Sequence, residues 1–325
     1  MSASQAARPY LRIKTTRLRV RSRMVLLLMR WLLRPWLGHL LSGSHKRLAK
    51  VQLRMAAQRC RDTKGLAFEY SIIGKVPGHC IGELGDTDRP VLLYLHGGAF
   101  VLPAAPPVHG AAVADLCNAL NSSGFLLDYR LAPLNRFPAA LDDCEQAYRA
   151  LLERGFPAER IMLAGESAGA NLLLGLLQRI RKAGLPMPCG AAAVSPATEM
   201  GRIHAPPSRA RLRLRDPILP AAALHRIDPL YAGGEDASNP ELSPLYMDCH
   251  DLPPIYLLAT DGEILADDTL LLAARMHEAG VELRVDLWPA LPHAFPLFGA
   301  VFPEAREARR DIVAFFRDTL ERATQ

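Results

Sequence analysis

Short, largely apolar runs recur after Gly65, separated by longer stretches with helical periodicity. We interpret the runs as buried strands over Val91–Leu95, Gly124–Tyr129, Arg160–Ala164, Gly190–Val194, Ile255–Ala259 and Val281–Trp288. The intervening stretches predict helices over Ala111–Leu120, Phe137–Arg154, Ala170–Lys182, Asp267–Ala279 and Glu304–Arg322. Buried strands that alternate with helices form parallel sheets covered on both faces. The sequence therefore predicts an α/β fold with a mostly parallel central sheet.

The composition agrees with one large folded unit. Half of the 325 residues are hydrophobic, which is enough for a sizeable core. The six cysteines are scattered and none forms a C-x-x-C pair, so neither a zinc site nor a disulfide framework is indicated. A reducing, cytoplasmic location is the simplest expectation.

The first 64 residues differ from the rest in charge. They contain 16 Lys and Arg and one acid, Asp62, so this segment carries +15. Because the whole chain carries +6, the remainder carries −9. A basic end of this kind is a candidate for peripheral contact with anionic lipid, whereas we expect no nucleic-acid partner.

An amphipathic helix is predicted within this segment, with Trp31, Leu32, Leu33, Trp36, Leu37, Leu40 and Leu41 as its apolar residues. Arg30 and Arg34 interrupt the apolar pattern, which argues against a transmembrane helix. The helix either lies on a membrane surface or covers an apolar pocket of the same protein. We favour the pocket.

A second irregular stretch, Pro196–Ser243, interrupts the strand–helix rhythm. It is rich in Pro and Arg, with a helical piece around Ala221–Ile227. We interpret it as an insertion between sheet elements. The expected organisation is thus a basic N-terminal segment, 1–64, followed by a catalytic domain, 65–325, with an insertion at about 196–243.

The segment Gly165-Glu166-Ser167-Ala168-Gly169 matches G-x-S-x-G between an expected strand and an expected helix. In this context the serine lies on a sharp turn with its hydroxyl exposed, and the glycines allow strand and helix to approach closely. Ser167 is the candidate nucleophile. The alternative is a small-residue helix start with Ser167 as its N-cap.

Three further features fit acyl transfer. His96-Gly97-Gly98-Ala99 follows a strand, so we expect the backbone N–H groups of Gly97 and Gly98, with that of Ala168, to stabilise an oxyanion. His293 follows the last strand and is the candidate base. The acid should follow Ile255–Ala259, where Asp261 and Glu263 both remain candidates because spacing alone does not separate them.

Together these motifs resemble the bacterial hormone-sensitive-lipase-like esterases, also called family IV lipolytic enzymes. The resemblance runs from about Val76 to Phe298 and includes Asp128–Pro133, Phe137–Asp143, Ser243–Tyr246 and Leu252–Pro254. It implies an α/β-hydrolase core with a helical cap built from the N-terminal segment and the insertion. It also implies a serine carboxylesterase acting on short- to medium-chain acyl esters through an acyl-enzyme, with no metal or organic cofactor.

The resemblance bears on the acid. The family's Asp-Pro-Leu-x-Asp-Glu pattern falls on 263–268, which makes Glu263 the preferred acid and Asp261 the alternative. Ala99 stands where the family commonly has a third glycine, and its N–H remains able to donate. An amidase, deacetylase or lactonase with the same triad, and a non-catalytic binding protein, are the rival functions. A homodimer is left open.

Overall fold

The central element is a nine-stranded sheet, seen in a computed structural model that describes residues 8–201 and 203–323. The first seven residues of the basic segment and Arg202 of the predicted insertion lie outside these ranges. In sheet order the strands are β1 (Leu11–Ile13), β9 (Leu283–Trp288), β8 (Ile255–Thr260), β7 (Gly190–Val194), β6 (Ile161–Glu166), β4 (Val91–Leu95), β5 (Ser123–Leu127), β3 (Val76–Ile81) and β2 (Phe68–Ile73).

The sheet is mostly parallel, as predicted. Within the described residues the antiparallel pairs are β2 with β3 and β3 with β5. The six predicted strands are all present, with ends shifted by at most two residues, and β4 and β7 have the predicted bounds. Every residue of the central strands β4 to β8 is buried, which explains their unbroken apolar runs.

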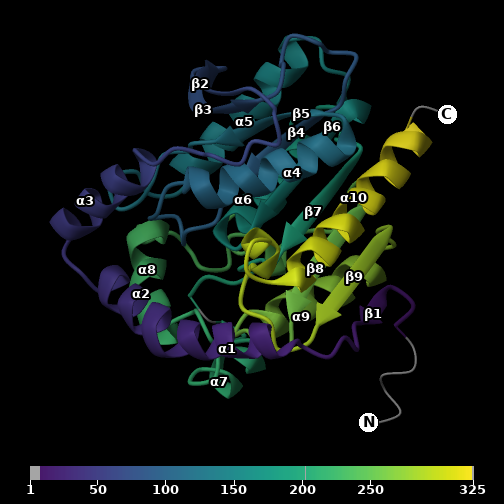
Figure 1. Cartoon of the computed structure of the whole chain (residues 1–325). Coiled ribbons are helices and arrows are strands. Elements are labelled where there is room, and N and C mark those ends of the chain that lie inside the picture. The colour runs from purple at the N-terminus through teal and green to yellow at the C-terminus, as the bar shows by residue number, and fades with distance from the viewer. Residues whose placement is uncertain (1–7, 202, 324–325) are drawn as a thin grey trace.

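Helices cover both faces of the sheet (Figure 1). One core layer lies under α5 (Ala139–Glu153), α6 (Ala168–Lys182) and α9 (Ala266–Glu278), and the other under α4 (Ala111–Leu120) and α10 (Pro303–Ala323). Each helix has an apolar face that needs such a partner layer.

Three strands were not predicted. β2 and β3 form a hairpin whose turn, Gly74-Lys75, has positive φ at both positions, 57° and 69°. Such turns match the twist of paired strands. The short strand β1 pairs in parallel with β9 and adds an edge strand from the basic segment to the sheet.

The remaining helices form a cap near the carboxyl ends of the strands (Figure 1). From the N-terminal segment come α1 (Val20–Leu28), a π turn (Met29–Leu33), α2 (Arg34–Leu41) and α3 (His45–Ala56). The insertion supplies α7 (Pro207–Arg211) and α8 (Ala221–Ala232). The two parts meet closely: a Cβ at Gly38 of α2 would lie 3.3 Å from the Cβ of Pro220.

Candidate active site

Ser167 occupies the turn between β6 and α6. Its backbone has φ 55° and ψ −119°, which is strained for a residue with a side chain. The two flanking glycines permit the turn: a Cβ at Gly165 would lie 2.8 Å from the carbonyl oxygen of Leu95, and one at Gly169 would overlap the same group. The fold therefore holds the Ser167 hydroxyl at the carboxyl edge of the sheet, facing the cap.

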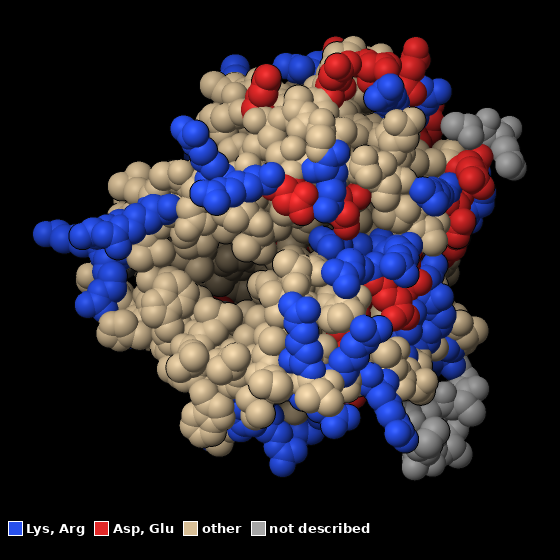
Figure 2. All heavy atoms as spheres, in the orientation of Figure 1, with Lys and Arg blue, Asp and Glu red and all other residues tan. Residues whose placement is uncertain are grey.

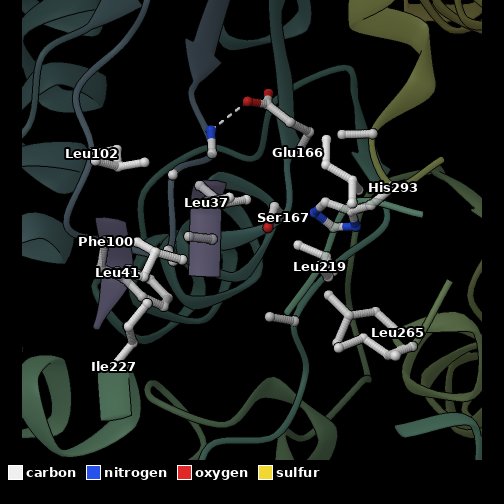
Figure 3. A pocket seen from close by; sticks show the side chains of 18 of the residues that line it. Leu37, Leu41, Phe100, Leu102, Glu166, Ser167, Leu219, Ile227, Leu265 and His293 are labelled. Atoms are coloured by element: carbon white, nitrogen blue, oxygen red, sulfur yellow. Dashed lines mark hydrogen bonds between the residues drawn. The ribbon is translucent and has the colours of Figure 1, made fainter. Parts of the chain in front are cut away.

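His293 lies on the loop that follows β9, close to this serine. Its Nδ1 is 2.6 Å from Oε2 of Glu263. Its Nε2 is buried and has no hydrogen-bond partner in the described part of the chain. In Figure 3 the imidazole lies beside the Ser167 hydroxyl. An imidazole fixed through one nitrogen and open at the other can accept a proton from that hydroxyl.

Glu263 is fully buried, and both of its oxygens are occupied. Besides His293, it accepts hydrogen bonds at Oε1 from the Ser195 hydroxyl at 2.8 Å and from the Thr260 N–H at 2.9 Å. The alternative acid, Asp261, is exposed, and its Oδ1 accepts from the Ala290 N–H at 2.6 Å. The structure thus brings Glu263, and not Asp261, to the imidazole.

The environment of His293 acts on its pKa in two directions. Burial lowers the pKa by disfavouring the charged ring. The hydrogen bond to Glu263 and the negative charges of Glu263 and Asp216 outweigh burial, so the net pKa is raised above its usual value. The imidazolium formed by proton transfer is therefore stabilised at this position.

The expected oxyanion loop differs from the prediction at Gly97. The Gly97 N–H already donates to Oε1 of Glu166, the dashed line in Figure 3, so it is not free to bind a substrate oxygen. After Gly97 the chain turns through positive φ at Gly98 (123°) and Ala99 (54°). Among the described residues no acceptor takes the N–H of Gly98 or Ala99. The Ala168 N–H opens α6, where the first amides have no intrahelical partner.

Glu166 supports this loop from below, a role that the sequence did not reveal. It is 1 % exposed, and its Oε1 lies 3.1 Å from Nε2 of His109. Burial raises the Glu166 pKa, but hydrogen bonds from His109, Tyr94 and Gly97 outweigh this and lower it overall. The signal available in the sequence was a carboxylate directly before the candidate nucleophile.

His96 takes part in the same support. Its ring stacks on Tyr129 at a centroid distance of 4.2 Å, and the Tyr129 hydroxyl donates to the His96 carbonyl at 2.6 Å. Burial lowers the pKa of His96 to about 4, so the ring is neutral at ordinary pH. These contacts hold the loop in place, so the neutral His96 ring supports the loop by stacking and hydrogen bonding.

Asp216 of the insertion fastens the cap to the acid loop, and sequence reasoning missed it as well. Its Oδ2 accepts from the Ile264 N–H at 2.8 Å, while Oδ1 accepts from the Ile218 and Leu219 N–H groups at 2.8 and 2.7 Å. Burial raises the pKa of Asp216, opposed by these hydrogen bonds. The residue next to Glu263 is thereby tied to the wall of the pocket.

A cavity of about 310 Å³ lies above Ser167 and His293. Its walls are largely apolar (Figure 3). The N-terminal segment contributes Leu33, Trp36, Leu37, Leu40 and Leu41, and the insertion contributes Ile218, Leu219 and Ile227. Small apolar cavities with a few convergent polar groups are typical of ligand sites.

Comparison with known proteins identifies the family of this chain. Residues 92–297 match the family model described as the alpha/beta hydrolase fold. An acetyl-hydrolase of Streptomyces hygroscopicus is 36 % identical over 243 residues, 74 % of this chain and 80 % of that protein. Esterase LipU of Mycobacterium tuberculosis is 35 % identical over 240 residues, 72 % of this chain and 79 % of its own length.

Solved structures agree with these relatives. An esterase from the bacterial hormone-sensitive lipase family superposes with a TM-score of 0.82 at 28 % identity, covering 94 % of this chain and all of the other. EstE5, soaked with p-nitrophenyl butyrate, gives a TM-score of 0.83 at 27 % identity over 93 % of this chain and 99 % of the other. The chain therefore belongs to the α/β-hydrolase family, among the hormone-sensitive-lipase-like esterases, and is a carboxylic ester hydrolase.

Proposed function

We propose that Ser167, His293 and Glu263 are the catalytic triad of a serine carboxylesterase. The observation that carries the proposal is the buried imidazole, bonded to Glu263 through Nδ1 and open at Nε2 beside Ser167. His293 takes the hydroxyl proton as Ser167 Oγ attacks the ester carbonyl, then passes it to the departing alcohol. Water activated by the same imidazole attacks the acyl-enzyme and releases the carboxylic acid.

The oxyanion of each tetrahedral intermediate is bound by backbone amides. We assign the N–H groups of Gly98, Ala99 and Ala168 to this role. The Gly97 N–H already donates to Glu166, which supports assigning the Ala99 N–H to the role predicted for the Gly97 N–H. Donors held in a loop that is itself hydrogen-bonded need no rearrangement as the charge develops.

The preferred substrate is a small-molecule ester with a short to medium acyl chain. The cavity volume of about 310 Å³ supports this because it lies at the lower end of the range for ligand sites. The relative named acetyl-hydrolase and the neighbour soaked with p-nitrophenyl butyrate point in the same direction. The cytoplasmic location remains a prediction from the sequence, as does the possible homodimer.

The domain division is proposed with one amendment. Residues 1–64 supply cap helices, and 65–325 form the catalytic domain with a cap insertion at about 196–243. Within the first segment, β1 belongs to the catalytic sheet, because it pairs with β9.

The decisive experiment is hydrolysis of p-nitrophenyl acetate, butyrate and decanoate by the protein and by Ser167→Ala. We expect turnover of the two shorter esters, weak turnover of decanoate, and loss of all activity in the variant. A folded protein that hydrolyses none of them overturns the esterase proposal and favours an amide or lactone substrate, or a binding role. Labelling with a fluorophosphonate, located by peptide mass spectrometry, tests Ser167 independently of the substrate.

A further inference from the structure

A continuous helical segment, Val20–Leu41, lies along the outside of the cap with little of its surface covered. It comprises α1, the π turn and α2, 22 residues in all, and only 11 % of its most apolar window is buried. Exposed large apolar side chains follow one side of it. We call these the outer stripe: Met24, Leu27, Leu28, Trp31, Leu32 and Trp36. Trp31 is 73 % exposed and Leu32 67 %.

The opposite side of the same helix is already occupied. Val25, Leu26 and Met29 pack on the core, and Leu37, Leu40 and Leu41 line the cavity. The π turn accommodates one extra residue in the helix, which keeps both sides in line along its length. A helix that is apolar all round normally has partners on every side. Here one side has none among residues 8–201 and 203–323, and apolar patches of this kind mark interaction surfaces.

Specific contacts hold the segment flat against the molecule. The buried Ser22 hydroxyl donates to the Glu304 carboxylate at 3.0 Å. Further along, Arg34 Nη2 donates to the Arg213 carbonyl at 2.6 Å, and Arg30 Nη2 to the Leu214 carbonyl at 3.1 Å. Although its length would suffice to cross a bilayer, crossing would break all of these contacts. The segment is therefore placed to lie on a surface.

The exposed charges that accompany the outer stripe are mostly basic. Asp62 is the first acidic residue of the chain, and exposed Arg19, Arg21 and Arg23 accompany the start of the helix. Arg213 and Leu214 of the insertion contact this helix, and residues 203–215 also contain no acid. In Figure 2 the lower part of the molecule, where Figure 1 places α1 and α7, shows tan and blue spheres, while red spheres gather at the top and right.

We propose that the outer stripe docks the protein on an anionic lipid surface, with the helix lying in the plane of the interface. Apolar side chains enter the headgroup–acyl boundary and the arginines meet lipid phosphates, as in other interfacial helices. A second copy of this chain is a poorer partner, because a two-fold contact would set the basic residues of one stripe against those of the other.

Docking in this orientation places the cavity next to the lipid. Leu37, Leu40 and Leu41 line the cavity, and Trp36, the last residue of the outer stripe, both lines the cavity and is 55 % exposed. An ester dissolved at the interface would then reach Ser167 without crossing bulk water. This access step rests on the proposed esterase function, whereas the docking itself does not.

Vesicle flotation of the full chain tests the docking, with phosphatidylcholine vesicles that contain or lack phosphatidylglycerol. We expect binding to the anionic vesicles that weakens with salt. Leu28→Gln/Trp31→Gln should lower the partition coefficient about tenfold or more by removing inserted apolar surface. The matched control is Ile72→Gln/Leu134→Gln, which removes two exposed apolar side chains elsewhere, 63 % and 87 % exposed, and should leave binding unchanged.

The charge contribution has its own pair of variants. Arg19→Gln/Arg23→Gln should weaken binding severalfold at low salt, whereas Lys75→Gln/Lys182→Gln, with the same charge change at other exposed positions, should not. Tryptophan quenching by brominated lipid should fall in Trp31→Phe and fall further when Trp36→Phe is added, because both residues belong to the outer stripe, whereas Trp288 is buried and does not contribute. Circular dichroism and hydrolysis of soluble p-nitrophenyl butyrate check that the variants fold.

Three results would overturn the proposal. The first is equal vesicle binding by the Leu28/Trp31 variant and its control. The second is a dimer in solution that this variant dissociates, with no vesicle binding by either form. The third is resistance of the bound protein to alkaline carbonate extraction, which indicates a spanning helix. A protein that binds vesicles but hydrolyses no ester retains the docking and loses only the access step.

Discussion

The hydroxyl of Ser195 donates a hydrogen bond to Oε1 of Glu263 at 2.8 Å, on the side of the carboxylate opposite His293. Ser195 follows β7 directly, with φ 48°. This strained position aims its side chain at the loop after β8. Ser195 is thus a positioning residue: it fixes the carboxylate that orients the imidazole, and it touches no substrate.

Replacing Ser195 with Ala should lower kcat about tenfold and leave KM nearly unchanged. A hydrogen bond to a charged group contributes about 1.5–3 kcal/mol, and Thr260 retains part of the restraint. Steady-state hydrolysis of p-nitrophenyl butyrate measures the split between kcat and KM. Ser238→Ala, which removes a serine bonded to an exposed carboxylate, is the control. An unchanged kcat in Ser195→Ala would mean that the Thr260 N–H alone positions Glu263.

Exchanging the two candidate acids for amides separates their roles. Glu263→Gln keeps the shape of the side chain but removes the charge that stabilises the imidazolium, so kcat should fall on the order of 10³-fold or more. Asp261→Asn should change kcat less than threefold, because Asp261 only caps the Ala290 N–H. The same assay compares both variants. A larger loss in Asp261→Asn would reverse the assignment of the acid.

The sequence predicted the parts of the fold that strong local signals define. The strands β4 and β7 lie in the core, and their uninterrupted apolar runs marked their ends. By contrast, β2 exposes Tyr70 and Ile72, and β1 has only three residues. Edge strands like these carry no continuous apolar run, so periodicity did not distinguish them from irregular chain.

The site divides in a similar way. The positions of Ser167 and His293 were predictable because each lies on the segment that follows a strand with a clear pattern. Spacing did not decide between Asp261 and Glu263, because a single residue separates them. Only the resemblance to the family favoured Glu263. The engagement of Gly97 by Glu166 and the clamp by Asp216 depend on long-range packing, with sequence separations of 69 and 48 residues. No local pattern encodes such pairs.

Removing the Asp216 carboxylate should loosen the cap and reduce activity together. Asp216→Ala leaves the N–H groups of Ile218, Leu219 and Ile264 without an acceptor in a buried site. We expect a loss of about 2–4 kcal/mol in the free energy of unfolding, from urea denaturation. Asp216→Asn keeps one acceptor oxygen and should lose about half as much. Equal stability of all three proteins would show that water replaces the carboxylate.

The pH dependence of kcat/KM should report the raised pKa of His293. The ring must be neutral to accept the serine proton, so activity falls as the pH drops through this pKa. Its midpoint should lie above the usual value of 6.5, because Glu263 and Asp216 outweigh burial. In Glu263→Gln burial remains and the main opposing charge is gone, so the midpoint of the residual activity should move down. A midpoint that stays in place or rises would show that a group other than His293 controls the pH dependence.

Deleting residues 1–15 should both destabilise the protein and make it self-associate. The deletion removes β1 and with it Arg12, whose Nε and Nη2 each lie 2.6 Å from the fully buried Asp286. Asp286 then keeps the Tyr256 hydroxyl but loses its bidentate cation, and the melting temperature should fall. The deletion also frees the edge of β9, and a free edge strand pairs readily with another chain.

Light scattering over a range of concentrations measures this association. Deletion of residues 1–7 leaves β1 in place and is the control. If the protein lacking residues 1–15 associates and the protein lacking residues 1–7 does not, β1 is the strand that prevents β9 from pairing with another chain. If the longer deletion stays monomeric but melts earlier, the Arg12–Asp286 pair explains the strand's contribution, and the exposed part of β9 is too short or too twisted to recruit a partner.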